Sequence, residues 1–318
     1  MKFNKPKFWD LREPNLLSYL LSPLTLFIRL NNFYLKFNSK KKFKKIISIC
    51  VGNIYLGGTG KTPTTLKLYD LLKKTNLKVV TAKKFYSDQK DEQIILKNKS
   101  KFISLKNRSE IFKKAIEENF DLVIFDDGLQ EKKVDYDVKF VCFDTKNWIG
   151  NGCLIPSGPL RENIESLKKY DGVFLKHDSE DINTQMISSK IKKINPNIRI
   201  FNTFIKIKHT NKFNLTNKYY VFSGIGNSNS FKDILIKNNF KIVEEKIFPD
   251  HYDYQNEDLI KILEKAKKID AQIITTEKDF VKIPNQYKDN INFLEIDLSI
   301  SEEDELKKFI ISKTHETN

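Results

Sequence analysis

The stretch VGNIYLGGTGKTP, residues 51–63, decides the fold because it ends like a phosphate-binding loop but spaces its glycines unusually. The standard loop reads G-x-x-x-x-G-K-[ST]. Counting back from Lys61, its first glycine belongs at position 55, which is Tyr55 here. An apolar run, residues 45–53, precedes the loop, and an amphipathic run with Pro63 near its start follows it. This context predicts a strand, a phosphate-binding turn and a helix.

The residues of the turn suit a nucleotide. Three glycines allow the backbone to turn tightly and to aim its N–H groups at a phosphate. Lys61 can reach the β- and γ-phosphates, and the hydroxyl of Thr62 suits Mg²⁺. A Gly-rich turn without a ligand is the alternative, which the GKT ending at a helix start argues against. The predicted cofactor-binding residues of this turn are Gly57, Gly58, Thr59, Gly60, Lys61 and Thr62.

A second motif, LVIFDDGLQ, spans residues 122–130. Asp126 and Asp127 end an apolar strand downstream of the phosphate loop, which is the Walker B arrangement that holds magnesium. Two adjacent carboxylates repel each other unless a cation separates them. An exposed turn is the alternative, because Asp-Asp-Gly is also turn chemistry. The sequence favours a metal site that includes Thr62 and these two aspartates, and it leaves open which aspartate touches the metal.

Strands and helices alternate along the rest of the chain. Predicted strands cover residues 77–85, 121–127, 136–145 and 170–177, and predicted helices cover residues 62–75 and 109–120. Such alternation implies a mostly parallel sheet that helices cover on both faces. A second series follows a long alternating strand, with predicted elements at 198–210, 218–227, 271–279, 291–299 and a helix from Glu302. The pattern predicts two α/β domains with a strand connector between them.

The N-terminal region predicts contact with a membrane surface. Residues 15–30 are strongly apolar, but Pro23 interrupts the run and Arg29 closes it, and the run is shorter than the roughly 20 residues of a spanning helix. A basic cluster, residues 36–45, follows. An apolar helix beside a lysine cluster suits an interfacial anchor on an anionic leaflet. A buried helix followed by a solvated charged turn is the alternative.

The composition of the 318 residues indicates an anionic partner. The net charge is +15 and the pI is about 9.4, which favours nucleic acid, an anionic membrane or a phosphorylated substrate. Lysine also recurs in unremarkable segments, so part of this charge reflects composition alone. The three cysteines, Cys50, Cys142 and Cys153, form no C-x-x-C pair, which fits a reducing compartment.

Six motifs in a fixed order resemble the tetraacyldisaccharide 4′-kinase family of lipid A biosynthesis. In chain order they are VGNIYLGGTGKTP, DDGLQ, GNGCLIPSGPLRE, SGIGN, FPDHYDY and TTEKD. SGIGN or TTEKD alone is weak, but the ordered set is specific and spans most of the chain. The loop of this family has the same GGTGKT ending and no glycine six positions before the lysine. The resemblance therefore accounts for Tyr55.

The resemblance implies a lipid kinase. The family transfers the γ-phosphate of ATP to the 4′-hydroxyl of a tetraacylated glucosamine disaccharide 1-phosphate and forms lipid IVA at the cytoplasmic face of the bacterial inner membrane. Its cofactors are ATP and Mg²⁺. The implied partners are the acylated disaccharide phosphate lipid and an anionic membrane surface, with no nucleic acid.

The resemblance also implies a domain organisation of two α/β/α sandwiches, with the active site in the cleft between them. We expect an interfacial segment over residues 1–45 and a P-loop kinase domain over 46–205. A strand linker then leads to a smaller second α/β domain over 206–318, which closes the cleft.

Two other functions are compatible with parts of the sequence. The positive charge and the Lys–Phe clusters also suit a basic P-loop NTPase that acts as a nucleotide switch or a nucleic-acid-associated factor. However, the chain contains no recognised nucleic-acid module. A non-catalytic membrane-bound scaffold would have no need of intact Lys61, Asp91 and Asp126.

The resemblance assigns roles to residues outside the loop. The family's GDEP segment aligns with KDEQ, residues 90–93, which places Asp91 and Glu92 in the site and Glu92 among the metal ligands. There the aspartate, paired with a histidine that matches His251, activates the sugar hydroxyl. A hydroxyl nucleophile needs such a group within hydrogen-bond reach. The implied catalytic set is therefore Asp91, His251 and Lys61.

Two further residues are assigned to the cofactor. Gln130 follows the two aspartates and is expected to line the cleft. Arg161 in PSGPLRE suits a phosphate because a guanidinium presents a matching fork, but it equally suits a cap of the turn after Pro159. TTEKD, residues 275–279, either closes over the nucleotide or caps the helix that follows it.

Two departures from the family's usual sequence bear on the site. Where the family reads DDGLQH, this chain has Glu131, so an anion replaces a neutral or positive side chain. Either the site compensates locally or that histidine is dispensable. The family's SRGYG is here AKKFYS, residues 82–87, which loses the glycine turn and gains Lys83 and Lys84. These two lysines would suit a phosphorylated lipid.

Overall fold

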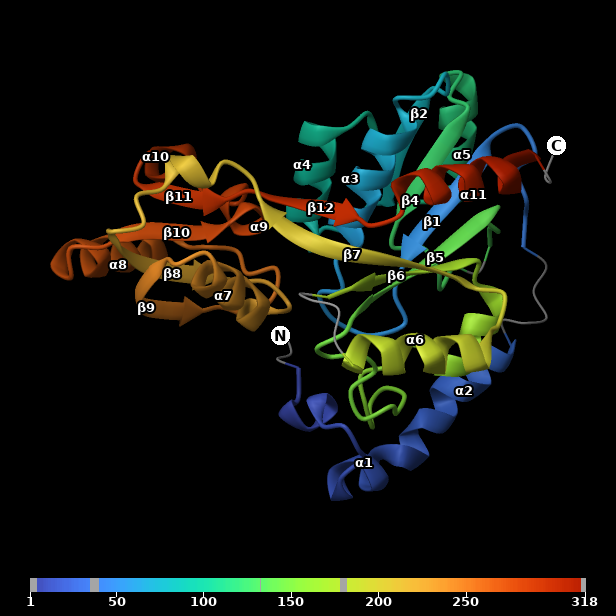
Figure 1. The fold of residues 1–318 in the computed structure, drawn as a ribbon, viewed down its shortest axis with the longest axis horizontal. Coiled ribbons are helices and arrows are strands. Elements are labelled where there is room, and N and C mark those ends of the chain that lie inside the picture. Colours follow the sequence, from blue (N-terminus) through green and yellow to red (C-terminus); the bar gives the residue numbers. More distant parts are fainter. Residues whose placement is uncertain (1–4, 35–39, 132, 178–181, 316–318) are drawn as a thin grey trace. The chain divides into compact units, whose positions relative to one another are not determined.

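The computed structural model describes residues 5–34, 40–131, 133–177 and 182–315, which form two compact α/β units (Figure 1). The larger unit comprises Lys5–Phe85, Leu96–Ile205 and the chain from Leu298 onward, and the smaller unit comprises Tyr86–Ile95 and Lys206–Asp297. The chain passes between the units within α4 (Lys90–Lys99), β7 (Arg199–Ile207) and β12 (Ile296–Ile300). Compared with the expected ranges, the last segment of the chain joins the larger unit and the segment around Asp91 joins the smaller one.

The larger unit is built on an eight-stranded sheet with the order β12-β7-β6-β5-β1-β4-β2-β3. Its other strands are β1 (Ile47–Gly52), β2 (Val79–Lys84), β3 (Phe102–Leu105), β4 (Leu122–Asp126), β5 (Val138–Asp144) and β6 (Gly172–Lys176). The central strand β1 pairs in parallel with β4 and β5, and nearly all of its side chains are buried. Near-continuous apolar runs of this kind are typical of strands buried on both faces.

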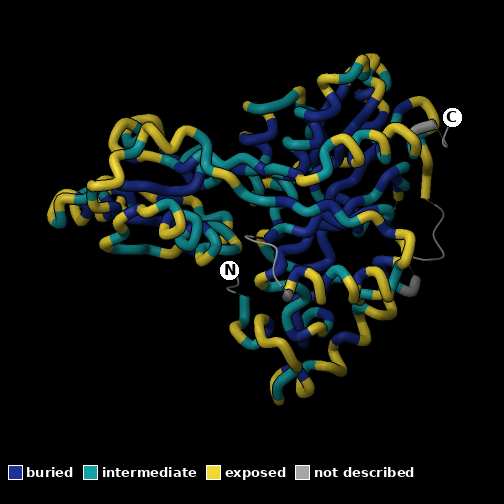
Figure 2. The backbone as a smooth tube through the Cα atoms, in the orientation of Figure 1, coloured by how far each residue is buried: buried dark blue, intermediate teal, exposed yellow. Residues whose placement is uncertain are grey.

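Helices cover both faces of this sheet, as the strand and helix pattern predicts. One apolar core joins the sheet to α5 (Arg108–Glu117) and α6 (Ile182–Ile194), and the other joins it to α3 (Lys61–Leu72) and α11 (Glu303–His315). Figure 2 shows the strands as the most deeply buried part of the unit. A fully buried Leu or Phe contributes roughly 1.5–3 kcal/mol to the free energy of unfolding. The predicted α/β/α architecture is confirmed.

The smaller unit repeats this architecture around a parallel sheet with the order β11-β10-β8-β9. The strands are β8 (Lys218–Ser223), β9 (Lys241–Ile247), β10 (Gln272–Thr276) and β11 (Ile291–Leu294). The helices α7 (Ser228–Lys237) and α8 (Asn256–Lys268) pack in two separate apolar clusters, and the short helices α9 (Glu277–Phe280) and α10 (Asn285–Lys288) follow β10. The predicted strand over 291–299 is wrong as one element, because the chain leaves β11 at Glu295 and enters the other sheet as β12.

The N-terminal segment lies on the surface of the larger unit as short helices. They are η1 (Lys7–Asp10), α1 (Leu16–Leu21), η2 (Ser22–Leu24) and α2 (Thr25–Tyr34). Elsewhere in the chain, two further 3-10 helices are η3 (Ile164–Lys169) and η4 (Thr210–Lys212). Pro23 ends α1 because a proline cannot continue its hydrogen bonds. Within the described part of the chain, no helix is long and apolar enough to cross a membrane. Of the predicted basic cluster 36–45, residues 36–39 lie outside the described residues.

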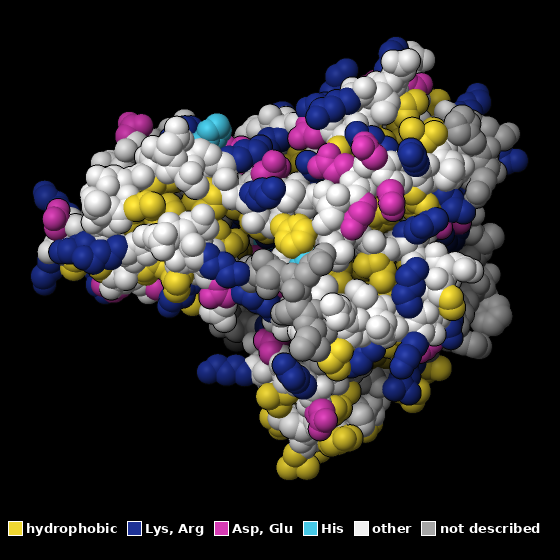
Figure 3. All heavy atoms as spheres, in the orientation of Figure 1, with side chains coloured by type: hydrophobic (Ala, Val, Ile, Leu, Met, Phe, Trp, Pro, Cys, Tyr) yellow, Lys and Arg dark blue, Asp and Glu magenta, His cyan; other side chains and the backbone are white. Residues whose placement is uncertain are grey.

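Most of the described apolar side chains of α1, η2 and α2 are exposed rather than packed in the core. Figure 3 shows them gathered at the end of the larger unit where α1 lies, at the bottom of the view. The exposed residues are Leu16, Leu17, Tyr19, Leu20, Leu24, Leu26, Phe27 and Leu30, with exposed fractions of 48–84%. The alternative of a buried N-terminal helix is therefore wrong.

Candidate active site

The phosphate loop between β1 and α3 makes its turn with Gly57 and Gly60. Gly60 stands before α3 in the left-handed conformation at φ 84°, and Gly57 has φ 150°. Tyr55 is only 1% exposed, and a Cβ on Gly57 would lie 3.0 Å from its ring. The backbone amide of Thr64 then donates to the Gly60 carbonyl (3.0 Å) and starts the helix. Tyr55 is therefore a packing residue, and the turn does not need a glycine at position 55.

The segment Ser157–Glu162 of the PSGPLRE motif braces this loop from one side. The Leu56 amide donates to the Pro159 carbonyl (2.8 Å), and the Arg161 amide donates to the Ile54 carbonyl (2.7 Å). Within the loop, the side-chain amide of Asn53 donates to the Gly57 carbonyl (3.2 Å). These bonds fix the loop backbone before any ligand binds, which lowers the ordering cost of binding a phosphate.

Each of the two carboxylates at the end of β4 faces a cation. Oδ2 of Asp126 accepts hydrogen bonds from the Thr62 hydroxyl (2.9 Å) and from the Lys83 ammonium (3.0 Å). Asp127 faces Nζ of Lys61 at 3.8 Å and Nη1 of Arg161 at 3.3 Å. Adjacent carboxylates repel unless cations separate them, and here lysine and arginine side chains do so.

The oxygen atoms gathered beside the loop fit a magnesium ion. The Thr62 hydroxyl and the Asp126 carboxylate lie together, with Asp127 next in sequence. Mg²⁺ in NTPases takes one or two carboxylates, keeps several waters and shares the phosphates of the nucleotide. The described residues contain no group of three or more His, Cys, Asp or Glu side chains that could hold a metal by themselves. The donor set therefore suits a metal that arrives with a nucleotide.

Gln130 links the loop to the bracing segment. Its Nε2 donates to the Asn53 carbonyl (3.0 Å) and to Glu162 (2.8 Å), while its Oε1 accepts from Arg161 (3.4 Å). The Tyr170 hydroxyl donates to the same Glu162 carboxylate (2.9 Å). Arg161 thus points at Asp127 beside the phosphate loop, and this position fits the phosphate interpretation better than a turn cap.

A second cluster surrounds Asp91 in the smaller unit. Asp91 lies in the first turn of α4 and is 1% exposed. Nδ1 of His251 lies 2.9 Å from both of its carboxylate oxygens, so the sequence-predicted pair is formed. Nζ of Lys278 lies 3.4 Å from Nε2 of the same imidazole, and the tautomer with its hydrogen on Nδ1 satisfies both neighbours.

Two lysines complete this cluster. Lys278 lies 3.1 Å from Glu92 and 4.0 Å from Asp91, and Lys282 lies 3.7 Å from Asp91. Burial alone would raise the pKa of Asp91, but the hydrogen bond from His251 and the two ammonium groups outweigh it, so this pKa lies below its usual value. The carboxylates Glu92, Asp250 and Asp91 hold the pKa of Lys278 above its ordinary value against the opposing effect of burial.

The SGIGN and TTEKD motifs form the scaffold of the Asp91 cluster. His251 adopts φ 56°, a strained conformation for a side chain of its kind, and its amide donates to the Gly224 carbonyl (3.1 Å). The fully buried Asp279 accepts from the Gly224 amide (3.0 Å) and from the Thr276 hydroxyl (2.7 Å). Thr276 caps α9, while Lys278 reaches Glu92. The two motifs thus position His251, Lys278 and Lys282 around Asp91.

Comparison with known proteins identifies the family. A model of the family described as "LpxK: Tetraacyldisaccharide-1-P 4'-kinase" matches residues 16–101 and 80–315. The tetraacyldisaccharide 4′-kinase of Pelagibacter ubique (strain HTCC1062) is 44% identical over 320 residues, which cover 100% of both chains. That of Rickettsia akari (strain Hartford) is 33% identical, with 98% of each chain covered.

The chain belongs to the tetraacyldisaccharide-1-P 4′-kinase family. A solved structure of LpxK from Aquifex aeolicus in complex with ATP shares this fold, with a TM-score of 0.70 at 22% identity, over 94% of this chain and 100% of that one. The family assignment decides against a nucleic-acid-associated switch. Kinase and transferase chemistry, the ATP requirement and the resemblance drawn from the six motifs are thereby confirmed.

Both departures from the usual 4′-kinase sequence have a structural explanation. The Arg108 guanidinium donates to the Glu131 carboxylate (2.6 Å) and to the Asp127 carbonyl, so the anion in place of the family's histidine is compensated locally. Lys83 is 1% exposed with its ammonium on Asp126, so it is not placed to attract a phosphorylated lipid, contrary to the expectation for this side chain.

Sequence reasoning did not predict the contacts of several charged residues of the site. They are Lys83, Arg108, Lys278 and Lys282. The signal for the last two is their spacing of four residues, which places both ammonium groups on one side of a helical turn. Nothing in the sequence signals Lys83 or Arg108, because each meets its partner only across neighbouring strands or a loop.

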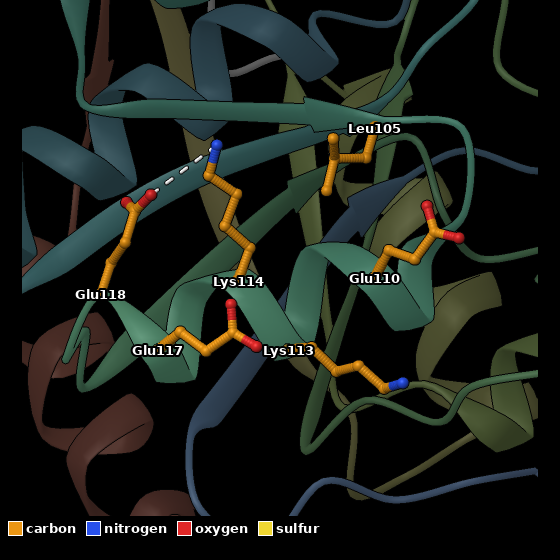
Figure 4. A pocket seen from close by; sticks show the side chains of 6 residues that line it. All are labelled: Leu105, Glu110, Lys113, Lys114, Glu117 and Glu118. Carbon is orange, nitrogen blue, oxygen red and sulfur yellow. Dashed lines mark ion pairs between the residues drawn. The ribbon is translucent and has the colours of Figure 1, made fainter.

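The hollow drawn in Figure 4 lies apart from the 4′-kinase motifs. It measures about 410 Å³ and is lined by acidic and basic side chains of α5 and of Glu118 just after it, together with Leu105 of β3. Lys114 and Glu118 form an exposed ion pair across it at 3.7 Å. None of the predicted site residues lines it, and a solvated face of a charged helix accounts for it.

Proposed function

We propose that this member of the tetraacyldisaccharide 4′-kinase family transfers the γ-phosphate of ATP to the 4′-hydroxyl of a tetraacylated glucosamine disaccharide 1-phosphate. The observation that carries the assignment of the catalytic base is the contact of His251 with the buried Asp91, 2.9 Å from Nδ1 to both carboxylate oxygens. The proposal requires this pair and the phosphate loop to act on the same γ-phosphate when both substrates are bound.

In the nucleotide half of the mechanism, the loop amides and Lys61 bind the phosphates of ATP. Thr62 with Asp126 or Asp127 would hold Mg²⁺, which neutralises charge that develops on the phosphates when it is bound. Arg161 lies 3.3 Å from Asp127 and can turn from it to a phosphate, because its side chain is 27% exposed. The family resemblance also implies Glu92 as a ligand of this metal, and in the structure its carboxylate lies 3.1 Å from Nζ of Lys278.

In the hydroxyl half, Asp91 accepts the proton of the 4′-hydroxyl as the oxygen attacks the γ-phosphorus, the bond to the β,γ-bridging oxygen breaks and ADP leaves. The lowered pKa of Asp91 keeps it ionised at neutral pH and therefore able to accept a proton. A carboxylate of this kind is a weak base, but phosphoryl transfer passes through a loose transition state in which positioning supplies most of the rate. His251 and Lys278 orient the carboxylate and stabilise its charge.

The lipid substrate implies that the protein works at a membrane surface. The support on this chain is the exposed apolar face of α1 and α2, whose side chains would enter the acyl region of an anionic leaflet. We therefore propose peripheral or monotopic attachment at the cytoplasmic face of the inner membrane, through this face.

The test of the base assignment is phosphate transfer to the tetraacylated disaccharide 1-phosphate by Asp91→Asn. We expect kcat to fall by about 10²-fold or more, because the variant is similar in shape but accepts no proton. Asp88→Asn, which changes an exposed aspartate three residues earlier, is the matched control. A near-normal kcat for Asp91→Asn would refute the base assignment while leaving the kinase activity in place.

A further inference from the structure

The proposed mechanism gives no role to Lys83, although its ammonium is among the most deeply buried charges in the protein. Lys83 lies near the end of β2, and the parallel register that pairs Ala82 with Phe125 brings it beside Asp126. Nζ lies 3.0 Å from Oδ2 of Asp126, and the side chains of the two residues are 1% and 0% exposed. A lysine at this depth is rare unless a carboxylate pairs with it.

The carboxylate oxygen that Lys83 contacts is also the one that Thr62 contacts. The Thr62 hydroxyl donates to the same Oδ2 atom (2.9 Å), so the ammonium and the hydroxyl together fix the orientation of the carboxylate. In a P-loop enzyme the threonine of the loop and one carboxylate at the end of this strand are the protein groups expected at Mg²⁺, and the contact with Thr62 favours Asp126 over Asp127. Lys83 thus places its ammonium in direct contact with a proposed metal ligand.

We infer that Lys83 is a positioning residue and an internal counter-ion of the metal carboxylate Asp126, which holds that carboxylate in place before Mg-ATP binds and partly substitutes for the charge of the metal. This inference rests on the proposed function, because it takes the metal to be the Mg²⁺ of ATP. As a consequence, nucleotide binding should depend less on Mg²⁺ than it would in a protein without this ammonium. The buried ammonium already neutralises Asp126, so the phosphates meet less repulsion when no metal is present.

Removing the ammonium should expose this dependence. In Lys83→Met the Asp126 anion has lost this counter-ion, so it repels nucleotide phosphates in the absence of metal. Mg²⁺ then restores binding, because it supplies the missing charge and meets no competing ammonium. We expect the ratio of the dissociation constant in EDTA to that in excess Mg²⁺ to rise about tenfold or more over wild type.

The probe is a fluorescent non-hydrolysable ATP analogue, titrated with the full-length protein in excess Mg²⁺ and in EDTA. Lys78→Met is the matched control, because it removes one exposed lysine just before the same strand and should leave the ratio at the wild-type value. If Lys83 were purely structural, its loss would raise both dissociation constants by the same factor. An unchanged or lower ratio in Lys83→Met would overturn the inference.

A second variant keeps the inference testable if Lys83→Met does not fold. Removing one partner of a buried ion pair is strongly destabilising, whereas replacing both by neutral groups is not. We expect Lys83→Met/Asp126→Asn to regain the thermal midpoint that Lys83→Met loses, and failure to regain it would contradict pairing with Asp126 as the role of the lysine. If the wild-type protein binds the analogue but never phosphorylates the lipid, the proposed function fails while the inference about Lys83 stands on the binding ratios.

Discussion

At the residue scale, Asp91 shows how a buried carboxylate stays ionised. Burial disfavours its charge, and His251, Lys278 and Lys282 together overcome that penalty. The same groups explain why a carboxylate with an exposed fraction of 1% can stand in the first turn of a helix, where the helix dipole also favours a negative charge. The proposed base is thus kept ionised by residues distant in the sequence rather than by its own sequence neighbours.

The lowered pKa of Asp91 makes a prediction about stability and pH. A carboxyl whose pKa is lower in the folded state stabilises that state fully above its unfolded pKa of about 3.9, and this stabilisation is lost as the pH falls below that value. We expect the excess free energy of unfolding of wild type over Asp91→Asn, measured by urea denaturation, to shrink between pH 6 and roughly pH 3. Asp88→Asn should show no comparable trend, and a constant excess would contradict the shift.

At the scale of elements, the phosphate loop shows which residues replace the glycine that the consensus has at position 55. Tyr55 fills the space under the loop, packs with Leu154 and Leu160, and its hydroxyl donates to Asp10 (2.7 Å). The left-handed conformation that starts α3 belongs to Gly60 instead. The loop is therefore held by a packed aromatic ring where other loops use a flexible residue.

Gly60→Ala tests that account through backbone strain alone. A Cβ at Gly60 would meet only Cδ of Lys176 at an ordinary 3.8 Å, so space is not the obstacle, but φ 84° costs an L-residue about 1–2 kcal/mol. We expect the free energy of unfolding to fall by that amount and nucleotide binding to weaken. Tyr55→Phe keeps the ring and should bind the ATP analogue as wild type does. Weaker binding in Tyr55→Phe would show that the hydroxyl, not the ring, supports the loop.

The same elements show which contacts could be predicted from the sequence and which could not. Lys61, Thr62 and the two aspartates could be predicted because each sits in a short motif whose geometry is local. The pair of Lys83 with Asp126 depends on the register of two parallel strands about 40 residues apart, which no local pattern sets. Asp91 and His251, 160 residues apart, could be paired only through the family resemblance. The change of sheet at Glu295 was missed because one apolar run supplies two strands.

At the scale of the whole molecule, the distribution of apolar surface supports the membrane attachment proposed above. The apolar side chains of α1, η2 and α2 stand together on one end of the larger unit, and both sheets are covered by helices. A group of large exposed apolar side chains of this kind is typical of an interaction site. Its neighbour in the chain is the lysine-rich stretch that begins the connection to β1, which adds attraction to anionic lipids.

Leu20→Ser/Phe27→Ser tests that orientation. Both side chains are more than 70% exposed, so their replacement should leave the thermal midpoint unchanged. Each buries apolar area worth roughly 1.5–3 kcal/mol when it enters the acyl region, so binding to anionic vesicles should fall about tenfold or more and KM for the lipid should rise. Binding of the ATP analogue should not change. Ile236→Ser, a 54% exposed residue of the smaller unit, is the control for a lost apolar side chain. If both variants lost vesicle binding equally, any exposed apolar side chain would account for the binding, and the membrane contact could not be assigned to this face.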